Sequence, residues 1–201
     1  MLFYAINITT KRLTPPVARA ALRGVRGSGR IYSMNETFLY FAYGSNMLTR
    51  RLRKRTPSAV VIGTGFVGGH RLTFDKVSTD GSGKCNIEST NDPADRVYGV
   101  LFSIEMSEAQ NLDEAEGLGS GYQKSGVHVV SPTGARMAVT YIADNTNPLL
   151  LPYDWYKDFV VRGAIEHKLP APYVRRLQTT DSQRDLNEKR RARNEAVLAQ
   201  A

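Results

Sequence analysis

The sequence predicts an α+β fold, a small mixed β-barrel-like sheet with flanking helices. Most of the chain between residues 38 and 143 divides into short apolar or alternating runs separated by turn residues, which is typical of strands. Few helical segments lie between those runs, so helical crossovers are scarce. Glycines interrupt the longest run, as bulges and barrel corners require.

The first strand is expected over residues 38–44, where "FLYFAYG" stays apolar until it reaches a glycine. A long strand with glycine-marked bends, "AVVIGTGFVGGHRLTFD", is expected next. Four shorter strands follow at 84–89, 96–104, 126–131 and 135–143. Together these segments predict a small sheet that bends or closes, with the helices outside it.

Two short helices are expected inside this strand-rich region. The first covers residues 47–55 and ends at the Thr-Pro pair that follows, because a residue before proline avoids helical geometry. The second covers residues 107–117. Its Ser107 and Gln110 have the spacing of a capping box, and Gly117 has the place of the C-cap.

The rest of the chain divides into a leader, a body and a tail. Residues 1–33 hold six basic and no acidic residues and lack periodic structure, so we interpret them as a leader outside the fold. They are either a transit peptide or sequence upstream of a start at Met34. The body, residues 34–178, ends in a helical stretch that "LPAP" interrupts. Residues 179–201 predict a polar, charged helix or tail, free to extend from the body.

The charge of the chain does not indicate a nucleic-acid partner. The whole sequence carries +8, but residues 34–178 hold 16 basic and 15 acidic residues, so the body is nearly neutral. No apolar run reaches the ~20 residues of a membrane span, so no membrane partner is expected. We expect a monomer or homodimer in the cytoplasm, with mitochondrial import of a longer precursor as the alternative.

Metal and cofactor sites are not expected either. Cys85 is the single cysteine, and the three histidines lie far apart, so neither a disulfide framework nor a metal-ligand spacing is present. Residues 63–68 match G-x-G-x-x-G, but a dinucleotide fingerprint must open a helix, and the sequence after it alternates like a strand. We therefore expect no cofactor and no metal ion.

Two further patterns have simple interpretations. The basic run "RRLRKR", residues 50–55, is interpreted as a solvated helix face. Ser45 lies outside the G-x-S-x-G context of a nucleophile elbow, with no His–acid pair nearby in the sequence. We therefore interpret Ser45 as a turn residue and not as a nucleophile.

The first strand stops at the turn Tyr43-Gly44-Ser45-Asn46, at the mouth of a helix. Asn46 is a favourable N-cap for that helix. The turn leaves backbone N–H groups pointing outward, which suits a carboxylate or phosphate, and Gly44 lets a ligand approach the backbone. The alternative is an ordinary capped turn.

A second candidate site is the acidic end of the second helix, with Asp113, Glu114 and Glu116. A carboxylate there lies at the negative end of the helix dipole, which disfavours its ionised form. Such a group suits general acid–base chemistry at neutral pH. The alternative is a solvated acidic helix end.

In combination these segments resemble a known family. "FLYFAYGSNM", "VYGVLF", "LDEAEG", "SGY" and "PYDWYKDFVVRGAIEHKLPAPYVRRL" occur in this order and resemble the γ-glutamylcyclotransferase family over residues 37–178. The resemblance implies a small mixed barrel with flanking helices. It also implies release of 5-oxoproline from a small-molecule γ-glutamyl substrate, whose own α-amine attacks the γ-carbonyl.

The resemblance further implies the site residues. Glu116, the second glutamate of "DEAEG", matches the catalytic glutamate, which acts as general base and then acid. The "YGSN" loop matches the segment that holds the γ-glutamyl group. The substrate-binding residues so implied are Tyr43, Gly44, Ser45, Asn46, Tyr122 and Tyr156. Two alternatives stay open: a relative that cleaves γ-glutamyl-amines, including acyl-protected intermediates, and a non-catalytic small-ligand binding protein on the same scaffold.

Overall fold

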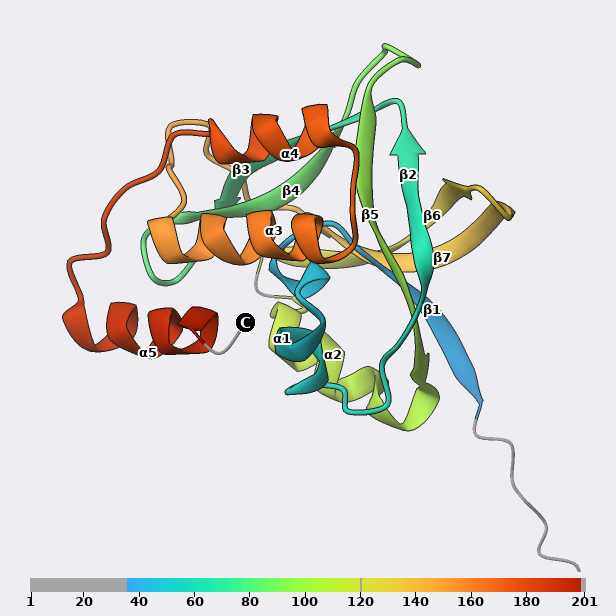
Figure 1. Ribbon diagram of the computed structural model, residues 1–201, viewed down its shortest axis with the longest axis horizontal. Helices are drawn as coiled ribbons and strands as arrows, with labels where there is room; N and C mark the ends of the chain where they lie inside the picture. Colours follow the sequence, from blue (N-terminus) through green and yellow to red (C-terminus); the bar gives the residue numbers. More distant parts are fainter. Residues whose placement is uncertain (1–35, 120, 200–201) are drawn as a thin grey trace, which may run out of the picture. The chain divides into compact units, whose positions relative to one another are not determined.

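The structure is a computed structural model that describes residues 36–119 and 121–199 (Figure 1). The expected leader, residues 1–33, lies outside the described residues. Among the described residues, no helix is long and apolar enough to cross a membrane.

Five strands close into a barrel, in the order β1-β5-β2-β6-β7. Most neighbours are antiparallel, and β7 returns to β1 through a parallel pairing of Tyr40 with Val139. Strands β3 and β4 form a separate two-stranded sheet. The predicted fold class, a small mixed barrel with flanking helices, is therefore confirmed. The strands are β1 Thr37–Ala42, β2 Val60–Gly68, β3 His70–Val77, β4 Gly83–Ser89, β5 Arg96–Glu105, β6 Tyr122–Ser131 and β7 Gly134–Ala143.

The expected long strand over residues 59–75 is wrong in one respect, because it is two strands. It breaks at Gly69, whose φ of 68° lies in the left-handed region that favours glycine. The chain turns there from the barrel into the β3–β4 sheet. The G-x-G-x-x-G stretch lies within β2 and pairs with β5, so it forms a strand, as its alternation predicted.

The helices lie where the sequence placed them, but their starts differ. Each of the two short helices follows a 3-10 turn, and the Ser107–Gln110 capping box is wrong because α2 begins without a side-chain cap. Gly117 does end α2 in the left-handed conformation, with φ 69°. The elements are η1 Ser45–Met47, α1 Thr49–Arg53, η2 Met106–Glu108, α2 Ala109–Glu116, α3 Asp154–Glu166, α4 Ala171–Gln178 and α5 Glu188–Ala199.

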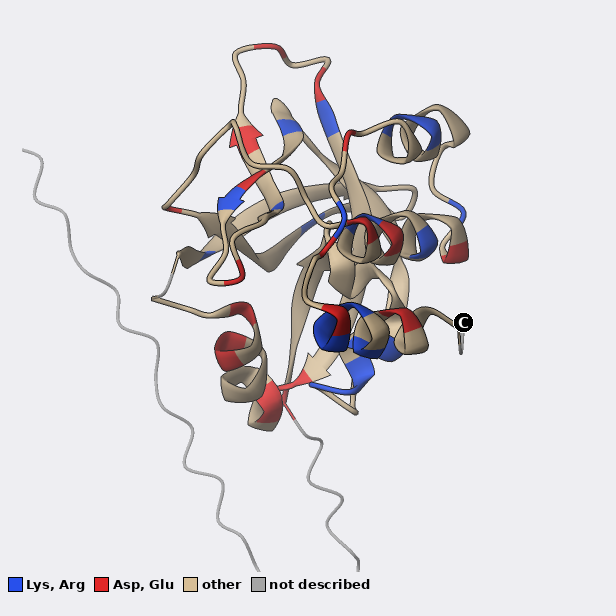
Figure 2. Ribbon diagram, turned by 90° about the vertical axis from the view of Figure 1, so that its left-hand side faces the viewer, with Lys and Arg blue, Asp and Glu red and all other residues tan. Residues whose placement is uncertain are grey.

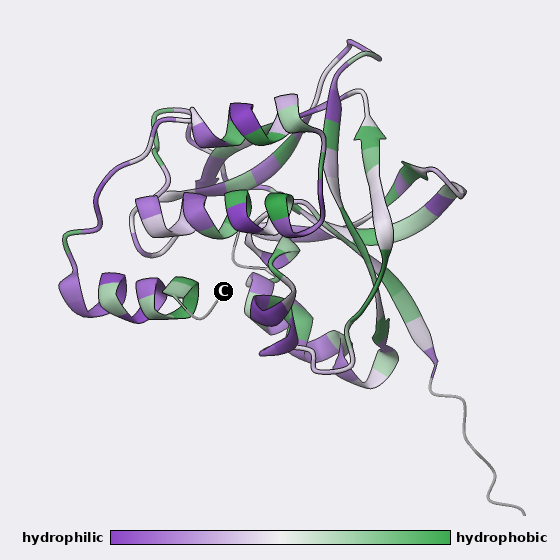
Figure 3. Ribbon diagram, in the orientation of Figure 1, coloured by the Kyte–Doolittle hydropathy of each residue, from purple (hydrophilic) through white to green (hydrophobic). Residues whose placement is uncertain are grey.

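The core joins the barrel to α3 and holds the turn after β1 in place. Phe41, Phe102 and Phe159 are fully buried in it, and Figure 3 shows apolar residues along the barrel strands and, alternating with polar ones, on α3. A Cβ on Gly163 of α3 would lie 2.6 Å from the Cβ of Met47. Helix α3 therefore packs directly on η1, and this contact fixes the Gly-Ser-Asn turn.

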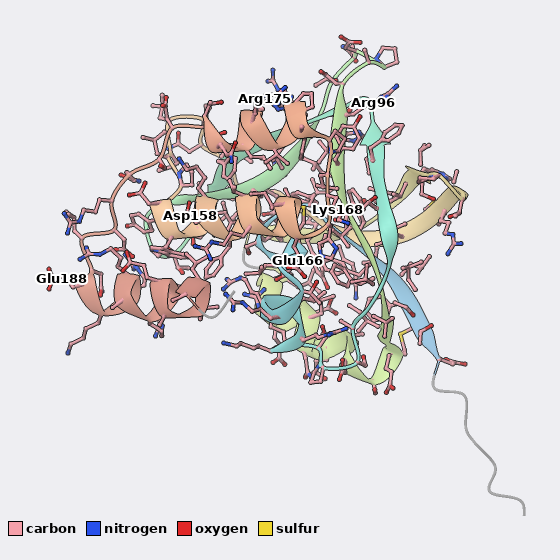
Figure 4. All side chains as sticks on the ribbon, viewed as in Figure 1. Arg96, Asp158, Glu166, Lys168, Arg175 and Glu188 are labelled. Carbon is pink, nitrogen blue, oxygen red and sulfur yellow. The ribbon has the colours of Figure 1, made fainter. Side chains whose placement is uncertain are left out.

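The tail is not free to extend, because α5 docks on α3 (Figure 1). Leu198 is buried at that contact, and Arg162 of α3 donates a hydrogen bond to its carbonyl. Figure 2 shows acidic and basic residues next to each other on the helix that ends beside the C label. In Figure 4, the exposed Glu188 lies at the outer end of the same helix. The buried Leu198 and a few polar contacts dock this polar helix, which its composition did not reveal.

Candidate active site

The turn after β1 is tightly packed. A Cβ on Gly44 would lie 3.0 Å from the Cβ of Cys85 on β4 and 3.5 Å from the Tyr156 hydroxyl of α3. Gly44 is therefore needed for the approach of the protein's own strand, in addition to any ligand. The backbone N–H groups of Ser45 and Asn46 open the 3-10 turn, and the described residues offer them no acceptor.

Asn46 does not cap a helix, which corrects the sequence prediction. Helix α1 begins after Leu48 and has no side-chain cap. The Asn46 side chain is instead turned inward, where its Nδ2 donates to Glu116 Oε1 and, at 3.1 Å, to the Tyr40 hydroxyl. The Gly-Ser-Asn turn and the acidic end of α2, whose bonded residues are 70 positions apart, are thus joined by the Asn46 side chain.

Glu116 lies at the centre of this meeting point, on the last turn of α2. Its Oε1 accepts hydrogen bonds from Asn46 and from Arg55, whose Nη1 is 3.1 Å away. The same Nη1 donates to Asn46 Oδ1 at 2.8 Å, so Arg55 orients both groups. Among the described residues nothing bonds to Glu116 Oε2. The Glu116 side chain is 17% exposed, so one oxygen is anchored and the other is available.

Arg55 forms an ion pair with Glu116, with Nη1 3.1 Å from Oε1, and both side chains are partly shielded from water. The interpretation of residues 50–55 as a solvated face is therefore wrong in part. Arg55 is half-buried against Glu116, and Arg51 donates to Ser45 Oγ at 3.2 Å with its guanidinium 4.4 Å from the Phe159 ring centroid.

The other two acids of the predicted cluster do not join the site. Asp113 is bonded to Lys124 and to the Tyr141 hydroxyl. Burial would raise the pKa of Asp113, but these hydrogen bonds outweigh it and hold that pKa below its usual range. Glu114 is exposed and accepts from Gln110 one turn earlier, at 2.9 Å. Of the three carboxylates, Glu116 alone contacts the Gly-Ser-Asn turn.

The tyrosines named by the sequence gather around Cys85, next to that turn. Tyr156 accepts a hydrogen bond from the Cys85 N–H at 3.1 Å, and Tyr122 donates to the Cys85 carbonyl. Tyr43 donates to the carbonyl of Tyr141 on β7. All three rings are buried. The structure thus brings every sequence-predicted site residue into one connected region.

The electrostatics of this region keep its tyrosines protonated. Burial raises the pKa of Tyr43, Tyr122 and Tyr156 well above the usual value, and the charge of Glu116 adds to the rise. Burial also raises the pKa of the Cys85 thiol to about 12. At neutral pH the region therefore offers phenol hydroxyls and a neutral thiol, beside the Glu116 side chain.

Sequence reasoning missed two members of the site. Tyr40 lies on β1 with its hydroxyl bonded to Asn46, and burial raises its pKa well above the usual value. Tyr40 was missed because the apolar first strand indicated a core position. Arg55 was missed because it stands in a run of similar basic residues. No local pattern in the sequence distinguishes Arg55 from its basic neighbours; its contact with Asn46 appears only in the fold. Within the described residues, no group of His, Cys, Asp and Glu is arranged to hold a metal ion.

Comparison with known proteins gives consistent matches. Residues 96–177 match the AIG2-like family. The gamma-glutamylcyclotransferase of Bos taurus is 32% identical over 152 residues, which cover 73% of this chain and 80% of the relative. The gamma-glutamylcyclotransferase of Homo sapiens is 33% identical over 151 residues, with the same coverage. A solved gamma-glutamyl cyclotransferase structure is 30% identical and superposes with a TM-score of 0.73, covering 83% of this chain and all of that one.

Proposed function

This chain belongs to the γ-glutamylcyclotransferase family and is an enzyme of that kind, and on this premise we propose that it releases 5-oxoproline from a γ-glutamyl compound with Glu116 as the proton carrier. The observation that carries the proposal is the asymmetry of Glu116. Its Oε1 is fixed by Asn46 and Arg55, and among the described residues its Oε2 has no partner. An anchored carboxylate with one free oxygen suits a general base.

The reaction is an intramolecular aminolysis. The α-amine of the γ-glutamyl group attacks its own γ-carbonyl carbon, and a C–N bond forms that closes the five-membered lactam. The bond from that carbon to the leaving amine then breaks. The α-ammonium first loses one proton to water to become the attacking amine. Glu116 takes a second proton from that nitrogen as the C–N bond forms and returns it to the leaving nitrogen, so the products are 5-oxoproline and a free amine. Correctly folded substrates of this type reach effective molarities of ~10⁵ M or more.

The turn after β1 supports this role as the holder of the substrate. The N–H groups of Ser45 and Asn46 have no acceptor among the described residues, so they can bind a substrate carboxylate or a developing oxyanion. The protonated Tyr122 and Tyr156 hydroxyls line the same region. Arg55 contacts Glu116 and Asn46 and is a positioning residue in this proposal.

A protein nucleophile is not part of the proposal. Ser45 Oγ accepts from Arg51 and has no base at hydrogen-bond distance among the described residues. Cys85 is buried, and its thiol stays neutral at physiological pH because burial raises its pKa to about 12. The substrate amine supplies the nucleophile in their place.

The test is a substrate panel with a blocked control. The protein is incubated with γ-glutamyl-amino acids, γ-glutamyl-amines and glutathione, and 5-oxoproline is measured. We expect release from at least one class and none from its α-N-acetyl derivative, because acetylation removes the attacking amine. Release of free glutamate, or turnover of the acetylated compound, would contradict the cyclisation. Binding without turnover of any compound would favour the non-catalytic alternative.

We also propose the cytoplasm as the compartment of this enzyme, on the hypothesis that translation starts at Met34. A fluorescent protein fused behind residue 201 should give diffuse cytosolic signal. Overlap with a mitochondrial dye would instead support import of a precursor.

A further inference from the structure

Lys76 is a buried lysine beside the candidate site that has no role in the chemistry above. It lies near the end of β3 and is 7% exposed. The pairing of β3 with β4 shifts between Thr73, which faces Asn86, and Lys76, which faces Lys84. This irregularity is a β-bulge, a feature that re-aims the side chains that follow it. It occurs immediately before Lys76.

The ammonium of Lys76 is directed at the tyrosine side of the site. Its Nζ lies 4.8 Å from the ring centroid of Tyr122. On the other side, a Cβ on Gly121 would lie 3.0 Å from Lys76 Cε and 3.3 Å from Nζ, so the absent side chain of Gly121 leaves room for the ammonium. Tyr122 in turn donates to the Cys85 carbonyl, next to Gly44. Tyr122 and Cys85 therefore connect the ammonium to the turn that is proposed to hold the substrate.

Among the described residues, this cation lacks the ion-pair partner that its neighbours have. Arg55 is paired with Glu116, and Lys84 is paired with Asp80 at 2.8 Å. None of the ion pairs among the described residues includes Lys76. Among the described residues, the fully buried side-chain nitrogen and oxygen atoms that lack a hydrogen bond belong to Arg50 and Tyr173. Lys76 Nζ is not one of these atoms, so it keeps some contact with solvent.

The charge of Lys76 interacts electrostatically with Glu116 on the other side of the site. Burial lowers the pKa of Lys76, and Glu116 is the strongest of the carboxylates that oppose this shift, ahead of Asp80 and Asp144. An ammonium that has lost most of its hydration and is paired with no anion among the described residues is costly. A carboxylate delivered by a ligand would relieve that cost and would lie within the field of the catalytic group.

We propose that Lys76 is a specificity residue that binds a carboxylate of the substrate, and that this carboxylate belongs to the leaving amino acid. The inference rests on the proposed function, in which the N–H groups of Ser45 and Asn46 hold the γ-glutamyl end. The carboxylate that remains unbound is then the one on the amine that departs. The preferred substrates would be γ-glutamyl-amino acids, in preference to γ-glutamyl-amines.

The experiment compares two substrates that differ by that carboxylate alone. γ-Glutamyl-alanine and γ-glutamyl-ethylamine are given to the wild type and to Lys76→Met, which keeps most of the side-chain volume and removes the charge. We expect KM for γ-glutamyl-alanine to rise roughly 10- to 100-fold in the variant, the effect of losing a hydrogen bond to a charged group. KM for γ-glutamyl-ethylamine should stay within about twofold, and this turnover also shows that the variant is folded.

Two further variants complete the test. Lys54→Met removes the same charge from an exposed position on the C-terminal side of α1 and should leave both KM values unchanged. Lys76→Arg keeps the charge and should retain most of the affinity for γ-glutamyl-alanine. Equal losses on both substrates would overturn the assignment, because Lys76 would then bind the γ-glutamyl carboxylate. Unchanged KM values would overturn it as well. If the wild type released 5-oxoproline from no member of the substrate panel above, the proposed function itself would fail, and this inference with it.

Discussion

Glu116 and Asp185 are each paired with an arginine, and the two pairs are built differently. Asp185 is fully buried, and each of its two oxygens accepts two hydrogen bonds. The four donor groups belong to Arg190, which supplies two, to Trp155 and to the N–H of Asn187. Glu116 is 17% exposed and has both of its bonds on Oε1. The arginines are equally exposed, at 24%, so the carboxylates make the difference.

This difference separates a structural carboxylate from one that can react. Four donors on Asp185 leave no lone pair for chemistry, and the pair fastens α5 to α3. Two donors on one oxygen of Glu116 hold it in place without filling the other. We infer that Asp185 contributes stability and that Glu116 contributes rate. Substitutions of these residues and of their partners should separate the two contributions.

The largest effect is expected for Glu116→Gln. The amide keeps the size of the side chain but cannot take a proton, and loss of a general base typically costs ~10²–10⁴-fold in rate. The loss should appear in kcat, with KM nearly unchanged, because the turn after β1 is proposed to hold the substrate. Glu114→Gln is the matched control, since Glu114 is exposed on the same helix and should turn over like the wild type. If Glu114→Gln were inactive and Glu116→Gln active, the catalytic role would have been assigned to the wrong carboxylate.

A smaller loss is expected for Arg55→Met. The variant keeps the volume of the side chain but removes the hydrogen bonds that orient Glu116 and Asn46. Bonds to charged groups contribute about 1.5–3 kcal/mol, which corresponds to roughly a 10- to 100-fold loss in kcat. Arg53→Met, two residues earlier and exposed, provides the comparison in the same steady-state assay. Equal activity of the two variants would show that Arg55 does not position the base.

The Asp185 pair should make the docking of the tail sensitive to acid. Hydrogen bonds from Arg190 hold the pKa of Asp185 well below its usual range, with Trp155 and Asn187 adding to the effect. The stability from this shift is therefore complete above the unfolded-state pKa of about 3.9 and is lost as the pH falls toward the folded-state value. Trp155, the single tryptophan, reports the change by fluorescence. An unfolding free energy that Asp185→Asn lowers equally at pH 7 and pH 2 would contradict this.

The smallest effect is expected for chelation. The proposed cyclisation uses a carboxylate and the substrate's own amine, so exhaustive EDTA treatment should leave kcat unchanged. The measurement is 5-oxoproline release before and after treatment. A loss of activity that zinc or magnesium restores would require a different mechanism.

The sequence predicted those parts of the molecule that local patterns control. Alternation placed the later strands, and Gly117 ended α2 because its left-handed conformation follows from a local rule. The break at Gly69 was missed because alternation continues on both sides of it, and only the pairing of β2 with β5 and of β3 with β4 separates them.

The site was predictable in its motifs but not in their connections. The resemblance indicated Glu116 and the Tyr-Gly-Ser-Asn turn, yet Asn46 appeared to be a helix cap because its partner lies 70 residues away. Arg55 shares its composition with the rest of the basic run, so only the fold selects it. The docking of α5 likewise depends on Trp155 and Asp185, 30 residues apart. Contacts of this kind have no local signal.

The central contrast is tested most directly by thermal unfolding of Glu116→Gln and Asp185→Asn side by side in one buffer. Removing one partner of a buried pair costs about 3 kcal/mol, at the low end of the usual range because Arg190 keeps contact with water. For a domain of this size the Tm of Asp185→Asn should therefore fall by about 6–12 °C. The Tm of Glu116→Gln should stay within about 2 °C of the wild type, since its carboxylate is not fully bonded. If Glu116→Gln melts as early as Asp185→Asn, Glu116 is a structural residue and its place in the chemistry is lost.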